Sequence, residues 1–149
     1  MNLFQTIKEI TREHVDSGGI ICSQTIVGAK KLFGTLPEEY VETTPGVIEL
    51  PTSDFSNGDI VVGCSLYKPS IYVIRFGGFT MLNCINVINY AAKCKEWGLK
   101  SKLFIRIMSC EGQIGPVASN MHHSLICHYP GIKVFSPMTS NEYLECWNE

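Results

Sequence analysis

Residues 70–97, SIYVIRFGGFTMLNCINVINYAAKCKEW, decide the fold class of this chain. The segment opens with a short apolar run, 70–76, that is rich in β-branched and aromatic residues and therefore predicts a buried strand. Residues 79–97 have the length of a helix, and Gly98 follows them as glycine commonly follows a helix end. Their apolar residues lie on more than one helical face, so we expect this helix to be covered on both sides.

Helices and short apolar strands alternate before and after this segment. Before it we expect a helix over 2–15, ended by the glycines of 16–19, and strands over 20–23 and 47–50; residues 24–46 are irregular, with room for a short helical turn. After it we expect a strand over 102–108, a Gly/Pro loop over 110–119, a helix over 120–128, a strand over 132–137 and a helix over 139–147. Thr139 and Glu142 form a capping-box pattern at the start of the last helix. Residues 60–66 fit a helix or a buried strand, since periodicity alone does not separate the two.

Continuous apolar strands with helices between them are typical of a parallel sheet with helices on both faces. We therefore predict an α/β fold in one domain that spans residues 1–149. Ligands of such sheets bind beyond the carboxyl ends of the strands, which points to the loops at 50–54, 76–79, 108–116 and 136–140. The chain ends directly after its last predicted helix, where a parallel sheet would ordinarily receive another strand. We expect the last strand to be missing, because these 149 residues are a fragment or because they form one subunit that needs a partner.

The composition narrows the class of function. With 45% hydrophobic residues, 17% charged residues and a net charge of −2, the chain has the composition of a globular protein with much buried or interface surface. Its Lys and Arg residues are scattered along the chain, so no basic stripe is present to neutralise the phosphates of a nucleic acid. Residues 1–15 carry charges and no apolar signal core, and no apolar run reaches the ~20 residues of a membrane span. We therefore expect a cytoplasmic protein without nucleic-acid or membrane partners.

The seven cysteines form no CxxC pair and lie mostly inside apolar segments. An odd number of cysteines in a chain without a signal peptide indicates reduced, buried thiols that act as small hydrophobic residues. Residues 122–128, HHSLICH, bring His122, His123, Cys127 and His128 together in sequence. This is a single cluster of such residues, and the segments that flank it are rich in aromatic residues. Both features are more typical of pocket or core residues than of a zinc site, so no metal site is predicted.

Three ordered motifs give the chain a resemblance to a known family. Residues 50–63, LPTSDFSNGDIVVG, match a Thr-Pro-x-Ser-Glu motif that runs into a Gly-containing helix, and residues 76–79 match a Phe-x-x-Phe loop before a long Asn-Glu-Ala-Ala-Lys helix. Residues 112–143 match a Gly-x-Gly-Pro loop, a His-x-Pro-Gly turn, a strand and a Ser/Pro-x-Thr helix start. The matching positions in the first two motifs are Pro51, Ser53, Asp54, Gly63, Phe76, Phe79, Asn89, Ala91, Ala92 and Lys93. This set resembles the β subunits of the first components of 2-oxo acid dehydrogenases, which are the pyrimidine-binding half of transketolase-type thiamine-diphosphate enzymes.

The resemblance implies a cofactor, a reaction and a partner. Asp54 matches a glutamate that hydrogen-bonds a ring nitrogen of the aminopyrimidine of thiamine diphosphate and helps to activate this cofactor, whereas Phe76 and Phe79 match aromatic residues of the pyrimidine site. His122 or His123 would supply an imidazole that faces the substrate. The implied enzyme cleaves or transfers at a carbon next to the carbonyl of a 2-oxo acid or ketose. It is expected to be active only with a partner chain that binds the diphosphate and Mg²⁺, and to self-associate through its pyrimidine-binding domains.

The chain departs from the family pattern in three respects. Asp54 is one methylene shorter than the family's glutamate, a difference in reach of about 1.5 Å. Ala118 stands where the dehydrogenase subunits have a histidine. The Gly-Asp-Gly signature of the diphosphate and Mg²⁺ site, with its later Asn, is absent, and we interpret the partial likeness of Gly58, Asp59 and Asn83 to it as coincidence.

Other interpretations stay open. A non-catalytic assembly or regulatory module would keep the fold and lose the chemistry, and a flavodoxin-like small-molecule binder would share the architecture. Asp54 or Asp59 is also a suitable helix N-cap, and Phe76 and Phe79 are also suitable core residues. His122 and His123 would point about 100° apart on a helix, which equally suits one packed and one solvated histidine.

Overall fold

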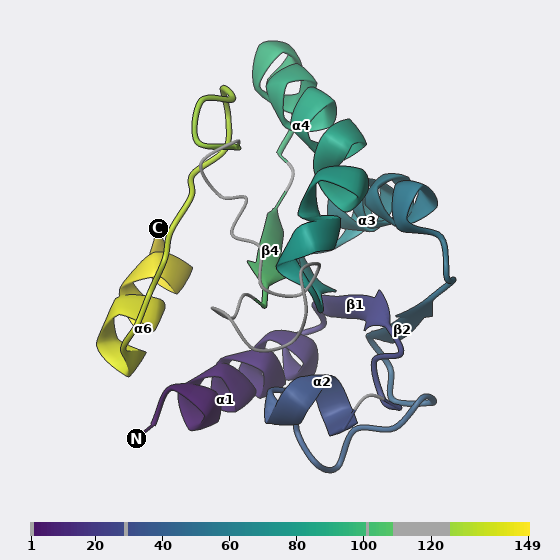
Figure 1. The fold of residues 1–149 in the computed structure, drawn as a ribbon, viewed down its shortest axis with the longest axis vertical. Coiled ribbons are helices and arrows are strands. Elements are labelled where there is room, and N and C mark those ends of the chain that lie inside the picture. Colours follow the sequence, from purple (N-terminus) through teal and green to yellow (C-terminus); the bar gives the residue numbers. More distant parts are fainter. Residues whose placement is uncertain (1, 29, 101, 109–125) are drawn as a thin grey trace.

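The computed structural model describes residues 2–28, 30–100, 102–108 and 126–149, in which helices and strands alternate along the chain (Figure 1). The elements are α1 (Leu3–Asp16), β1 (Ile20–Gln24), α2 (Lys30–Gly34), β2 (Val47–Leu50), α3 (Asp54–Tyr67), β3 (Ser70–Ile74), the 3₁₀ turn η1 (Gly77–Phe79), α4 (Thr80–Trp97), β4 (Leu103–Ile107) and α6 (Ser140–Asn148). The predicted α/β class is confirmed. No helix among these described residues is long and apolar enough to cross a membrane.

The four strands form one parallel sheet in the order β2-β1-β3-β4. Ile21 of β1 pairs with Val47 of β2 on one side and with Ile71 of β3 on the other. Ile71 in turn pairs with Phe104 of β4. Because all four strands are parallel, their carboxyl ends meet at one edge of the sheet, and β1 and β3 occupy its centre.

The side chains of the central strands alternate between two apolar layers. Ile21, Ile71 and Val73 belong to the layer on the side of α1 and α2. On the other face, Cys22 and Tyr72 belong to the layer that α3 and α4 cover. Figure 1 shows α1 and α2 below the strands and α3 and α4 above them, so the prediction of helices on both faces is confirmed.

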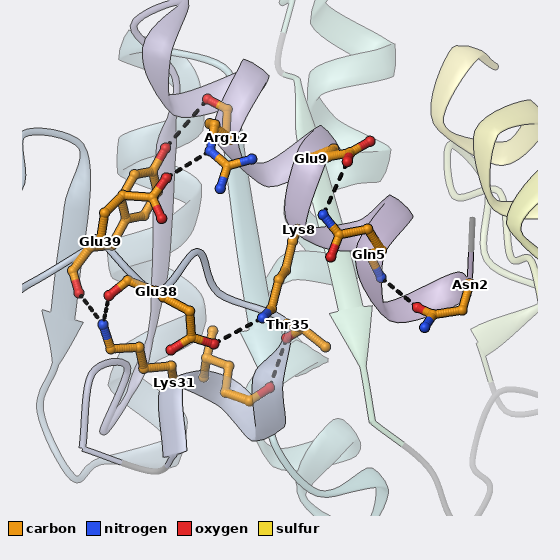
Figure 2. A network of polar contacts seen from close by, with 11 residues as sticks. Asn2, Gln5, Lys8, Glu9, Arg12, Lys31, Thr35, Glu38 and Glu39 are labelled. Atoms are coloured by element: carbon orange, nitrogen blue, oxygen red, sulfur yellow. Dashed lines mark hydrogen bonds and ion pairs between the residues drawn. The ribbon is translucent and has the colours of Figure 1, made fainter.

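Polar contacts fasten the segment after α2 onto α1, as Figure 2 shows. Lys8 Nζ lies 2.9 Å from Glu38 Oε1, and Arg12 Nε lies 2.7 Å from Glu39 Oε1. The hydrogen bonds from Lys8 and from Arg12 lower the pKa of each glutamate. These exposed pairs orient the segment and contribute little stability, since water screens them.

Helix α3 begins earlier than the sequence indicated. Of the two possibilities for residues 60–66, the helix is correct, but α3 already starts at Asp54, six residues before that stretch. The N-cap is Ser53, which has an extended backbone. Asp59 is an exposed residue inside the helix, so neither aspartate is the N-cap. Residues 52–58 have weak helix propensity, so the sequence did not indicate the first helical turn. Packing of α3 overrides this local preference.

The irregular stretch 24–46 holds a short helix, as expected, but its hand is unusual. Residues Lys30 to Phe33 all have positive φ, from 45° to 55°, the left-handed region that is unfavourable for residues other than glycine. Leu32 is fully buried, and Thr35 Oγ1 donates a hydrogen bond to the Leu32 carbonyl at 2.7 Å. Core packing therefore holds this turn against its local preference.

The end of the chain differs from prediction in one element. The predicted strand over 132–137 is wrong: residues 132–138 form no strand, although Ile132 and Val134 still pack on the apolar layer under α3 and α4. An apolar pattern reports burial, whereas a strand also needs a neighbouring backbone to pair with. The final helix is confirmed with its capping box, in which Thr139 and Glu142 exchange hydrogen bonds. The predicted loop over 110–119, and the predicted helix over 120–128 up to residue 125, lie outside the described residues.

Within this chain, helix α4 is buried on one side only. Cys84 and Ile88 are buried against the sheet, whereas Ile85 is 47% exposed and Trp97 is 62% exposed. Within the described residues, the expectation that both sides of the helix are covered is therefore not met, since the second apolar side faces outward.

Candidate functional site

A cleft opens at the carboxyl edge of the sheet, where ligands of parallel sheets bind. The ends of β1 and β3, the first residue of α3 and the start of α4 line it, and its empty space amounts to about 280 Å³ when the part open to solvent is included. Asp54, Phe76 and Phe79 all contribute to its lining. These three residues come from two loops that the sequence places far apart, and the fold brings them together.

The turn after β1 determines how Gln24 enters the cleft. Thr25 has a positive φ of 52°, and the backbone N–H groups of Thr25 and Ile26 both donate to the Glu49 carboxylate of the neighbouring strand, the second of them at 2.7 Å. The glutamate thus accepts two otherwise unpaired backbone donors at the point where β1 ends. Gln24 is left as the last strand residue, with its side chain at the cleft.

Asp54 lies in a small network of side chains. Its Oδ1 accepts one hydrogen bond from Gln24 Nε2 at 3.1 Å and another from Asn83 Nδ2 at 3.3 Å. Asn83 Oδ1 accepts a hydrogen bond from the hydroxyl of Tyr72, so the network continues from α3 through α4 to β3. As an acidic residue in the first turn of α3, Asp54 is also favoured by the helix dipole.

Aromatic rings form the apolar side of the cleft. The rings of Phe76 and Phe79 lie edge-to-face with centroids 6.1 Å apart, and Phe33 of the left-handed turn contacts Phe76 at the same centroid distance. The guanidinium of Arg75 lies 5.5 Å from the centre of the Phe76 ring. Such pairs restrict ring motion, so the aromatic surface beside Asp54 is pre-organised.

The buried groups under the cleft are not nucleophiles. Burial raises the pKa of the Tyr72 hydroxyl, so this group stays protonated and acts as a hydrogen-bond donor at neutral pH. Burial also raises the pKa of the Cys22 and Cys84 thiols to about 12, which leaves them without reactive thiolate. The described part of the cleft therefore offers a carboxylate acceptor beside aromatic rings and no reactive thiolate.

The structure brings together three of the five predicted site residues: Asp54, Phe76 and Phe79. His122 and His123 lie outside the described residues. Asn83, whose likeness to a metal signature we interpreted as coincidence, is buried at the cleft, whereas Asp59 of the same pattern is exposed on α3. In the described ranges no group of His, Cys, Asp or Glu side chains could hold a metal ion.

The sequence did not reveal Gln24, Tyr72 or Asn83 as neighbours of Asp54. Tyr72 and Asn83 are buried polar residues inside apolar segments, and this was the signal that could have identified them. The signal for Gln24 was weaker: it is the polar residue at the end of an apolar strand.

No protein-family model matches this chain, and no curated protein is similar to it at a significant level.

Proposed function

We propose that this chain is the pyrimidine-binding half of a thiamine-diphosphate enzyme that acts on a 2-oxo acid or a ketose in the cytosol, together with a partner chain. One observation carries the proposal: Asp54, Phe76 and Phe79, the residues that the motifs assign to the cofactor, line a single cleft at the carboxyl edge of a parallel sheet. The motif order alone would permit these residues to lie on separate surfaces. Their convergence is the arrangement that the proposed role requires.

The lining residues of the cleft have the chemistry to contact an aminopyrimidine ring. Phe76 and Phe79 offer apolar ring faces and edges, and the Asp54 carboxylate offers an acceptor beside them. A diphosphate group needs several cationic or backbone donors and usually a metal ion, and Arg75 is the one cation among the described lining residues. The cleft therefore suits the pyrimidine end of the cofactor, and the diphosphate and Mg²⁺ fall to the partner chain.

In this proposal the lining residues of the cleft have separate tasks. Phe76 and Phe79 hold the ring plane and exclude water from one side of it, which strengthens polar contacts in the cleft. Asp54 accepts or shares a proton at a ring nitrogen. The cofactor, when bound, supplies the electron sink for cleavage beside a carbonyl.

The test is cofactor binding by the chain in its native assembly. The tagged chain is purified together with the partner that accompanies it, and thiamine diphosphate with Mg²⁺ is titrated into the folded complex by calorimetry. We expect saturable binding that Asp54→Ala weakens and Asp59→Ala, a matched change of an exposed aspartate on the same helix, leaves unchanged. A folded complex that binds no cofactor refutes the proposal.

A second candidate is a non-catalytic module that keeps the fold. It is favoured by the aspartate in place of the family's glutamate, because catalytic hydrogen bonds need heavy-atom distances of about 2.6–3.2 Å and the shorter side chain reaches less far. Turnover of 2-oxo acids or ketoses by the complex separates the two candidates. Equal activity of the native complex and of its Asp54→Glu and Asp54→Ala variants would remove Asp54 from catalysis.

A further inference from the structure

The hydrogen bonds to Asp54 are unevenly divided between its two carboxylate oxygens. Gln24 and Asn83 both donate to Oδ1, at 3.1 Å and 3.3 Å, and among the described residues no hydrogen bond reaches Oδ2. Two donors on one oxygen fix the rotation of the carboxylate plane. The other oxygen keeps its lone pairs for a group that enters the cleft.

The orientation of the Asn83 amide follows from its other partners. Asn83 Nδ2 also donates to the Phe79 carbonyl at 2.9 Å, and a carbonyl can only accept, so the nitrogen must be on this side. The Oδ1 side then receives the hydroxyl of Tyr72, which burial keeps protonated. Asn83 is 3% exposed, so turning the amide over would leave buried donors and acceptors unpaired.

We propose that Asn83 and Gln24 are positioning residues, whose carboxamides hold Asp54 Oδ1 so that Oδ2 is presented to the aminopyrimidine ring. The inference rests on the proposed function and specifies how that site is organised. Asn83 also holds the Phe79 carbonyl, so one buried amide sets both the acid and the backbone of the aromatic wall. A short aspartate has fewer rotatable bonds than a glutamate, and pinning one oxygen makes its remaining orientation nearly unique.

A double-mutant cycle in the complex separates positioning from general support of the fold. Asn83→Leu removes the amide that bonds Asp54 and the Phe79 carbonyl and replaces it with a side chain of similar volume. Asn86→Leu is the matched control at an exposed position of α4. We expect Asn83→Leu to weaken binding of thiamine diphosphate with Mg²⁺ about 10-fold when Asp54 is present, as the loss of one hydrogen bond predicts. In the Asp54→Ala background only the loss of the contact to the Phe79 carbonyl remains, so the same change should weaken binding by a clearly smaller factor. An equal factor in both backgrounds overturns the inference.

Gln24→Ala repeats the test from a less buried position, and it serves where Asn83→Leu does not fold. It should weaken binding in the Asp54 background and not in the Asp54→Ala background. Effects that simply add would again overturn the inference.

A ligand-independent measurement distinguishes failure of the inference from failure of the proposed function. In the full ¹⁵N-labelled chain, Asp54→Ala should shift the side-chain NH₂ resonances of Asn83 and Gln24, whereas Asp59→Ala should not. If these resonances shift but the complex binds no cofactor, the proposed function fails, and the positioning role fails with it. If the complex binds cofactor but the resonances do not respond to Asp54→Ala, the proposed function stands and the positioning role is refuted.

Discussion

Gly58 and Gly63 lie in the same helix and should respond to alanine in opposite directions. A Cβ added at Gly58 would collide with the backbone carbonyl oxygen of Asn83 and would lie 3.5 Å from Val87 Cγ2, so α3 and α4 could not keep their present separation. A Cβ added at Gly63 meets no atom within 4 Å. The two substitutions have the same chemistry and differ only in what the new methyl group touches.

The magnitudes follow from two opposing effects. Replacing glycine by alanine inside a helix stabilises by roughly 0.5–1 kcal/mol, because alanine loses less backbone entropy on folding. Forcing an extra methyl group into a packed contact costs about 1–3 kcal/mol. We therefore expect Gly63→Ala to raise the free energy of unfolding by roughly 0.5–1 kcal/mol. For Gly58→Ala the packing cost outweighs the gain, which leaves a net loss of about 1–2 kcal/mol.

The assay is urea unfolding of the full chain and both variants, followed by circular dichroism, with thermal melts as a second measurement. At this chain length 1 kcal/mol corresponds to a change in Tm of about 2–4 °C, so the two variants should melt on opposite sides of the wild type. If Gly58→Ala stabilises as much as Gly63→Ala, α3 and α4 do not make the close contact, and the packing that brings Asn83 to Asp54 is refuted.

Three further predictions concern buried and strained residues. Asn57 is fully buried, and neither of its amide atoms makes a regular hydrogen bond in the described part of the chain, although the amide lowers the pKa of the neighbouring Tyr72. Asn57→Leu should therefore raise the free energy of unfolding, measured in urea, by about 1–3 kcal/mol. A lower free energy of unfolding would show that the amide is satisfied. Lys30 has a φ of 45°, so Lys30→Gly should raise the free energy of unfolding by about 1 kcal/mol. A decrease in the free energy of unfolding, as glycine usually causes inside a helix, would contradict the left-handed turn. His14 is buried, which lowers its pKa, so the unfolded state binds its proton more readily. As pH falls below about 6.5 toward that lowered pKa, stability should fall, and this slope should be smaller in His14→Phe; identical slopes would exclude His14 as a cause.

The alternation of elements could be predicted because each element has a local signal. The strand at 47–50 was bounded by Gly46 and Pro51, and the last helix was marked by the Thr139–Glu142 capping box. The strand predicted over 132–137 had the same apolar signal, but strand formation depends on a paired neighbour that the pattern does not encode. For the candidate site, motifs identified Asp54, Phe76 and Phe79, and no local signal linked Asp54 to its hydrogen-bond donors.

Local patterns predicted most of the helices and strands and the parallel α/β class, because periodicity, glycines and caps act within a few residues of one another, and the motif resemblance pointed to three residues that line the cleft. No local pattern indicated that Gln24 and Asn83 both donate to one oxygen of Asp54, or that Gly58 packs against the backbone of Asn83; both follow from how the helices and strands pack. The same holds for the left-handed turn at Lys30 to Phe33. These features depend on contacts between segments that are distant in the chain, and packing energy there outweighs the local preferences that a sequence pattern records.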